Sequence, residues 1–127
     1  MPYTTEVIDN GKGVLHTGSR TVTGQDLIAS AATLLQQIKN GLRPEYGFTD
    51  LSGVTDFTVT SGEIERNADL NKEIARLCPS VRVAIVASAD VVYGMARKWQ
   101  AHVDESGWTS MVFRTKEEAA EWLKQGR

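Results

Sequence analysis

The chain has 127 residues, of which 41% are hydrophobic, and its 14 Lys and Arg against 16 Asp and Glu give a formal net charge of -2. This length suits one ordinary domain, and the apolar fraction can build one core without disulfides or a structural metal, so we expect a single domain over residues 1–127. The balanced charge, with no long run of one sign, argues against nucleic acid as a partner and against a polybasic membrane anchor.

The N-terminus and the single cysteine set further limits. The first residues carry neither a basic start nor a continuous apolar segment, and no window is apolar enough for a membrane helix. We therefore expect a cytoplasmic protein without a membrane span. Cys78, the only cysteine, excludes an internal disulfide. It lies on an apolar helical face just before Pro79, which favours a packed small hydrophobe over a reactive thiol.

The chain begins with a predicted β-hairpin. Tyr3–Ile8 alternates like a half-exposed strand, and the turn residues Asp9–Gly13 lead into a second strand over Val14–Gly18. We place this hairpin at the edge of the sheet. Because it has few charges and no proline beyond Pro2, the edge is poorly protected, and we predict self-association as a homodimer.

Two helices and a short strand are predicted next. Apolar residues recur at helical spacing from Gln25 to Leu42, and Thr23 is the expected N-cap. Tyr46–Leu51 reads as a short strand followed by a polar loop. A second helix then runs to Pro79, with Thr60 and the residue three positions on, a glutamate, forming a capping box.

The next segment predicts a buried strand and a third helix. Val81–Ala87 is nearly continuously apolar, as expected for a central strand of a parallel sheet. Either Ser88 or Asp90 is expected to cap the helix that follows. Its apolar residues recur four apart, which predicts one buried face made of Val91, Met95, Trp99 and Val103.

A last strand over Thr109–Arg114 and a helix capped at Thr115 complete the chain. The order is strand, strand, helix, then three further strand and helix units with right-handed crossovers. We predict an α/β fold with a mostly parallel sheet of about five strands, an N-terminal edge hairpin and four helices.

Polar side chains follow several of these strands, at the sheet edge where α/β proteins usually bind ligands. Serine, threonine and aspartate are also the residues that helices prefer as N-caps, so capping alone explains many of them. A phosphate at the start of the second helix would be accommodated by free N–H groups and by the helix dipole. The residues concerned are Asp50, Ser52, Thr60, Ser61, Ser88, Asp90 and Thr115.

Two groups of residues resemble a known family. The sequence Asp50-Leu51-Ser52-Gly53-Val54-Thr55 followed by Thr60-Ser61-Gly62 resembles the Asp-Leu-Ser-x-Val and Asp-Ser-Ser-Gly patterns of STAS domains, which have the anti-sigma factor antagonist fold. The segments 93–99 and 112–123 are similar to the SpoIIAA-like branch, whose members are mostly uncharacterised. In the regulatory members, the resemblance implies, an anti-sigma kinase phosphorylates the first hydroxyl of the second pattern, which corresponds to Thr60, with Ser61 next to it. Val59 stands where that pattern has its aspartate.

The main functional hypothesis is a non-enzymatic STAS-like regulatory or protein-interaction module of unknown pathway, with a degenerate phosphoswitch at Thr60 or Ser61 and an anti-sigma-type kinase as partner. The alternative is a small-molecule or lipid-binding domain whose apolar cleft beside the third helix is formed by Tyr93, Met95, Trp99 and Trp108. An apolar stripe at helical spacing is more often core packing.

An enzyme is the third hypothesis, with Asp50 or Asp90 as a general base. His16 and His102 lie far apart in the sequence, His16 in a predicted edge strand, and each reads as a packed or surface histidine. No metal-ligand spacing, nucleophile elbow or phosphate-binding glycine loop is present. We therefore expect no catalytic residues, no metal and no cofactor.

Overall fold

The computed structural model describes residues 2–126. Strands and helices alternate along the chain after an initial hairpin, and two short 3-10 turns, Asp9–Gly11 and Asp104–Ser106, complete the set. The elements are β1 (Tyr3–Ile8), β2 (Gly13–Thr23), α1 (Gly24–Lys39), β3 (Tyr46–Thr58), α2 (Ser61–Leu77), β4 (Arg82–Val86), α3 (Asp90–Val103), β5 (Thr109–Phe113) and α4 (Lys116–Gln125).

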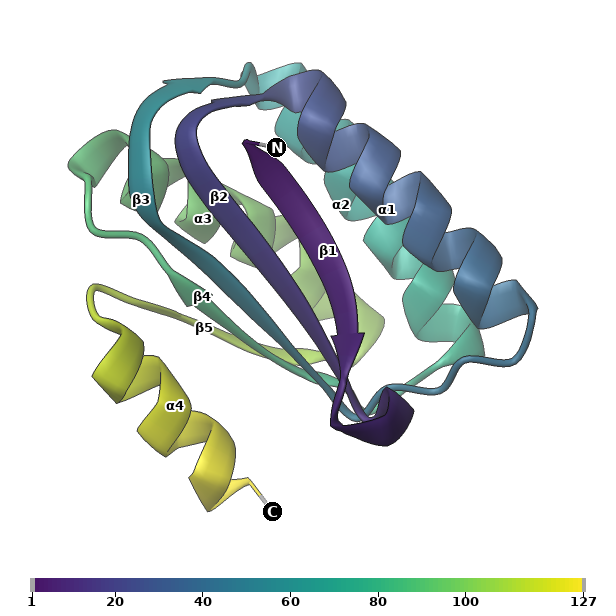
Figure 1. Ribbon diagram of the computed structural model, residues 1–127. Helices are drawn as coiled ribbons and strands as arrows, with labels where there is room; N and C mark the ends of the chain where they lie inside the picture. The colour runs from purple at the N-terminus through teal and green to yellow at the C-terminus, as the bar shows by residue number, and fades with distance from the viewer. Residues whose placement is uncertain (1, 127) are drawn as a thin grey trace.

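The strands form one sheet in the order β1-β2-β3-β4-β5 (Figure 1). β1 and β2 pair antiparallel, and every later pair is parallel. The predicted α/β fold, with its mostly parallel five-stranded sheet, edge hairpin and four helices, is confirmed for residues 2–126. β1 is the edge strand, and the expected dimer remains a prediction.

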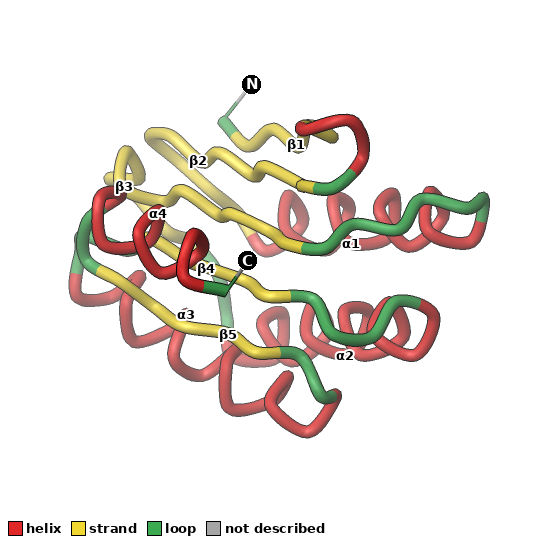
Figure 2. The backbone as a smooth tube through the Cα atoms, turned by 90° about the horizontal axis from the view of Figure 1, so that it is seen from below, coloured by secondary structure: helices red, strands yellow, loops and turns green. Residues whose placement is uncertain are grey.

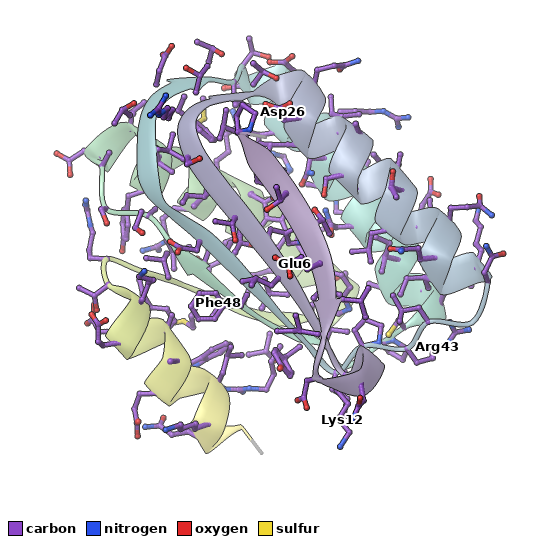
Figure 3. All side chains as sticks on the ribbon, in the orientation of Figure 1. Glu6, Lys12, Asp26, Arg43 and Phe48 are labelled. Atoms are coloured by element: carbon purple, nitrogen blue, oxygen red, sulfur yellow. The ribbon has the colours of Figure 1, made fainter. Side chains whose placement is uncertain are left out.

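The helices cover the two faces of the sheet unequally. α1, α2 and α3 pack side by side on one face, and α4 lies alone on the other, against β3, β4 and β5 (Figure 2). The main hydrophobic core fills the space between the sheet and the three helices. A smaller cluster lies under α4, where Phe48 of β3 packs beside Ala84 and Ala119 (Figure 3).

Both long strands extend further than the sequence predicted. β2 runs to Thr23 rather than Gly18, and β3 continues past Leu51 to Thr58, so the predicted polar loop is strand. The added residues pair with each other in register, for example Val22 with Phe57, after shifts in the β2 register. These shifts are bulges, which bend and twist strands. Together the curved ends bring the chain to the starts of α1 and α2 (Figure 1).

Three of the four predicted helix starts are confirmed. Thr23 and Thr60 each form a capping box with the residue three positions on, and the Thr115 side chain accepts from the N–H of Glu118. The prediction for α3 was wrong in this respect, because its N-cap is Ala89, without a side-chain cap. Neither Ser88 nor Asp90 caps the helix.

The buried face of α3 also differs from the predicted one. Val92, Ala96, Trp99 and Val103 are buried, whereas Val91 is 61% exposed. Met95 is half-buried and packs against the core from the side. Across residues 2–126, every helix is too short or too polar to span a lipid bilayer.

Candidate functional sites

The start of α2 holds the two predicted phosphorylation candidates in different environments. The Thr60 hydroxyl accepts from the N–H of Glu63 (3.2 Å) and donates to the Glu63 carboxylate (3.1 Å), which also accepts from the Thr60 N–H (2.9 Å). Ser61 is exposed in the first helical turn, and its hydroxyl makes no side-chain hydrogen bond to any residue in the range 2–126. Thr60 therefore has a structural role as a cap, and Ser61 is the freer hydroxyl.

Val59 precedes this pair and belongs to the hydrophobic core. It is 7% exposed and packs in the main cluster. The STAS pattern has an aspartate at this position. In this chain an aspartate here would place an unpaired carboxylate in the core, which would be costly, so the valine suits the buried position.

Asp50 and Ser52, two residues of the predicted polar edge, are joined by hydrogen bonds. The Asp50 carboxylate accepts from both the backbone N–H (3.0 Å) and the hydroxyl (2.6 Å) of Ser52. Its other oxygen lies 3.8 Å from the Lys116 ammonium at the start of α4. This carboxylate is thus used to shape β3 and to contact α4.

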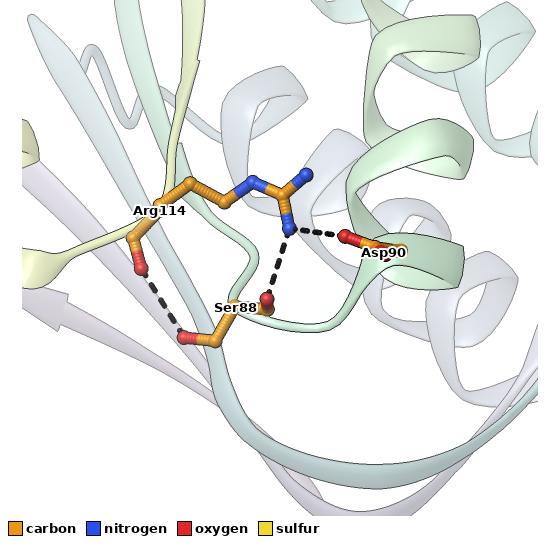
Figure 4. Close-up of polar contacts among 3 residues, drawn as sticks. All are labelled: Ser88, Asp90 and Arg114. Carbon is orange, nitrogen blue, oxygen red and sulfur yellow. Dashed lines mark hydrogen bonds and ion pairs between the residues drawn. The ribbon is translucent and has the colours of Figure 1, made fainter.

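Ser88 and Asp90 meet around Arg114, which follows β5 (Figure 4). One guanidinium nitrogen donates to the Ser88 carbonyl (3.0 Å) and pairs with Asp90 (2.8 Å), while the Ser88 hydroxyl donates to the Arg114 carbonyl (3.2 Å). The guanidinium also lies 4.0 Å from the centre of the Tyr93 ring. These contacts tie the end of β4 to the end of β5.

The predicted polar edge is therefore divided into separate groups. No hydrogen bond or ion pair between described residues joins Asp50 and Ser52 to Ser88 and Asp90, or either pair to Thr60. Each group is engaged in local structure. Neither Asp50 nor Asp90 lines the cavity described next.

A cavity of about 110 Å³ lies inside the main core, between the sheet and helices α1, α2 and α3. Native interiors rarely contain voids larger than a water molecule. Trp99 and Trp108 line it, whereas Tyr93 and Met95 do not. Two of the four residues predicted for an apolar cleft beside the third helix therefore line this cavity, and ligand binding there remains a prediction.

Polar side chains form one wall of this cavity. His16 and Thr49 line it and are neighbours on β2 and β3, and Thr5 is the neighbour of His16 on β1, outside the lining. The His16 Nδ1 atom lies 2.9 Å from the Thr5 hydroxyl, which in turn lies 2.6 Å from the hydroxyl of Ser30 on α1. The Tyr3 ring stacks on His16, with centroids 5.8 Å apart.

Burial controls the ionisation of this wall. It lowers the pKa of His16 to about 4, so the imidazole is neutral at physiological pH. Burial, with a smaller effect from Asp26, raises the pKa of Tyr3 above its usual range. The sequence predicted that His16 lies in an edge strand. That prediction was wrong, because His16 lies in β2, between β1 and β3, and the edge strand is β1.

Asn67 of α2 links three helices at the opposite wall. Its amide nitrogen donates to the Leu27 carbonyl of α1 (2.9 Å), and its oxygen accepts from the Trp99 indole N–H of α3 (2.8 Å). Asn71, one turn further on, donates to the same oxygen (3.0 Å) and also lines the cavity. Sequence reasoning missed both asparagines, because a polar pair one turn apart on a helix reads as a solvated face.

The other residues with reactive side chains have simpler roles. Cys78 is buried, as predicted; its thiol donates to the Pro44 carbonyl (3.3 Å), and burial raises its pKa. His102 lies 3.6 Å from Glu65 between α3 and α2. Within the part of the chain that the structure describes, no three His, Cys, Asp or Glu side chains gather as metal ligands.

Comparisons with known proteins identify the fold. No known family profile matches the sequence, and no curated protein is significantly similar to it. Among solved structures, the anti-sigma factor antagonist SpoIIAA in its unphosphorylated form is 15% identical, with a TM-score of 0.60 over 96% of this chain and 97% of that one. Phosphorylated SpoIIAA from Bacillus is 13% identical, with a TM-score of 0.60 over 95% and 98%.

An uncharacterized protein from the DUF3478 family of Shewanella loihica PV-4, described as having a SpoIIAA-like fold, is 15% identical, with a TM-score of 0.59 over 95% of this chain and 91% of that one. The three similarities extend over nearly the whole chain. The chain therefore has a STAS-type, SpoIIAA-like fold, as the resemblance in its sequence predicted.

Proposed function

We propose that this chain is a non-enzymatic, STAS-like regulatory module that binds a partner protein at the start of α2. The observation that carries the proposal is the SpoIIAA-like fold together with the two hydroxyls that the chain presents there. Around them lies an exposed surface formed by the end of β3 and the first turn of α2, which we call the α2 entry surface; its residues are Thr55, Asp56, Thr58, Thr60, Ser61 and Gly62.

Ser61 is the better candidate for a phosphoswitch on this surface. Modification of Thr60 would displace a hydroxyl that caps α2, whereas Ser61 is exposed and uses no side-chain hydrogen bond. A phosphate in the first turn of a helix is favoured by the positive end of the helix dipole and adds about two negative charges. Those charges, beside Asp56 and Glu63, would change which partners can bind.

The partner class that fits this proposal is an anti-sigma-type kinase. One of the similar structures is of SpoIIAA in its phosphorylated form. A kinase that binds this chain and phosphorylates it would contact the α2 entry surface directly. The test incubates the purified protein and candidate kinases from its own genome with ATP, then measures complex formation and locates phosphate by mass spectrometry.

Matched variants make this test specific. We expect S61A to lose the phosphate and S88A, which removes an exposed hydroxyl at the end of β4, to keep it. T60A should keep the phosphate on Ser61 although its helix cap is weakened. If the wild-type protein neither binds nor is modified by any of these kinases, the proposal fails.

A further inference from the structure

We propose that the interior cavity is the binding site of a small, uncharged, mainly apolar molecule that carries one hydrogen-bonding group, of the size and kind of a phenol. This site is separate from the α2 entry surface, and the inference does not depend on the function proposed there. It rests on the volume of the cavity, on the chemistry of its walls and on the hydrogen-bonding atoms that the fold leaves available.

The volume sets the size of the ligand. The cavity measures about 110 Å³, and an engineered apolar cavity of about 150 Å³ binds benzene. One ring or a short alkyl chain therefore fits. A full-length lipid does not fit in this volume, which narrows the predicted alternative of a small-molecule or lipid-binding domain to the small molecule.

The walls set its charge. The residues that line the cavity include no aspartate, glutamate, lysine or arginine, and most of them are apolar. Trp99 and Trp108 supply aromatic surface at the side of α3 and the chain after it. An ionised ligand would lose its hydration without gaining an opposite charge, so an uncharged molecule is favoured.

Two atoms on the sheet wall can hold its polar group. Within residues 2–126, His16 uses Nδ1 for its side-chain hydrogen bonds, to Thr5 and Ser30, which leaves Nε2 with one donor or acceptor function. Thr49 lies on β3, next to His16 of β2, and it also lines the cavity. Its hydroxyl makes no side-chain hydrogen bond to any residue in the range 2–126. A hydroxyl placed between these two side chains can both donate and accept.

The polar wall also lies near solvent. Thr5 is exposed and Ser30 is half-buried, although both belong to the contact between β1 and α1 that covers this part of the sheet. A ligand would therefore enter along the β1 edge, with its polar group last. The asparagine pair at the opposite wall is held by α1 and α3, which keeps that wall in place.

The test measures binding of phenol and of toluene to the full chain by isothermal titration calorimetry. A purely apolar void prefers toluene, because phenol must give up hydrogen bonds to water. We expect phenol to bind about tenfold more tightly than toluene, since one satisfied hydrogen bond contributes roughly this factor. Failure of both compounds to bind, or tighter binding of toluene, would overturn the proposal.

Variants locate the binding. A96L fills the cavity from α3 and should abolish binding of both compounds, whereas V91L, which enlarges an exposed residue of the same helix, should leave both unchanged. A31L fills the cavity from α1 and replaces A96L if circular dichroism shows that A96L is unfolded. H16F replaces the imidazole with a phenyl ring that has no nitrogen, and it should reduce phenol affinity to that of toluene. Unchanged phenol binding in a folded cavity-filling variant would contradict the site.

Discussion

The carboxylate of Glu63, in the first turn of α2, occupies the space that a Cβ atom on Gly24 would fill at the start of α1. The same carboxylate accepts hydrogen bonds from the N–H and the hydroxyl of Thr60. One side chain thus closes the α2 capping box and packs on the first residue of α1. The starts of the two helices are coupled through it.

This coupling predicts that G24A is destabilising. Alanine is the better helix former, but its methyl group would displace the Glu63 carboxylate from Thr60, and losing a capping interaction costs about 1 kcal/mol. Urea denaturation measures the free energy of unfolding. In an E63A background, G24A should cost nothing further, since the carboxylate is already absent.

G94A is the matched control, because Gly94 lies inside α3 with no atom within 4 Å of an added Cβ. That substitution should stabilise the protein by about 0.5–1 kcal/mol, the usual gain of alanine over glycine in a helix. Equal effects of G24A and G94A would show that Glu63 does not couple the two helices.

The two hydroxyls at the start of α2 should differ in their effect on stability. T60A removes the side chain that accepts from the Glu63 N–H, and we expect a loss of about 1 kcal/mol in the free energy of unfolding. S61A removes an exposed hydroxyl and should change it by less than about 0.5 kcal/mol. Thermal and urea unfolding of both variants check this, and a larger loss for S61A would contradict the assigned cap.

Local signals explain why the helix starts were predictable. Each of the three confirmed caps is a threonine whose partner lies three residues further along the chain. Such a motif depends on only four residues of sequence. The threonines are Thr23, Thr60 and Thr115. The α3 face was harder to predict. Apolar residues four apart drift by about 40° per step around a helix, so the predicted series starts outside the buried stripe at Val91 and reaches it only at Trp99 and Val103.

The cavity could not be predicted because its walls come from distant segments. His16, Ser30 and Asn67 meet there only after β2, α1 and α2 have packed. Ser52 to Thr58 reads as a polar loop, and its strand conformation depends on pairing with β2. Sequence periodicity reports which residues face a core, but it does not report where that core is incompletely filled.

Asn67 should contribute more to the free energy of unfolding than an asparagine on an exposed helix surface does, because it joins α1, α2 and α3. N67A would leave the Trp99 indole N–H, which is nearly buried, without its acceptor, and we expect a loss of about 1–3 kcal/mol. N71A should cost less, because Asn67 keeps its bonds to Leu27 and Trp99.

A double-mutant cycle isolates the bond between the two side chains. W99F removes the indole donor, so N67A should cost less in the W99F background than in the wild type. Urea denaturation of the four proteins gives the coupling free energy. Additive losses would show that the Asn67 oxygen does not satisfy Trp99.

His16 should make stability depend on pH. Its pKa is about 4 in the folded protein against an ordinary value of 6.5, so between these values the unfolded chain binds a proton that the folded protein does not. The contribution of the neutral His16 to the free energy of unfolding is complete above pH 6.5. It declines as the pH falls from 6.5 to about 4, and it levels off below about pH 4. A shift of this size corresponds to about 3 kcal/mol.

H16F isolates this contribution, because every other titrating group is shared with the wild type. The difference in unfolding free energy between the two proteins, measured by urea denaturation from about pH 7 to pH 4, should shift in favour of H16F as the pH falls. Thr5 and Ser30 remain bonded to each other when the imidazole is absent, which limits other losses. Parallel curves across this range would mean that the His16 ring reaches solvent freely in the folded protein, and the polar wall of the cavity would then be open rather than buried.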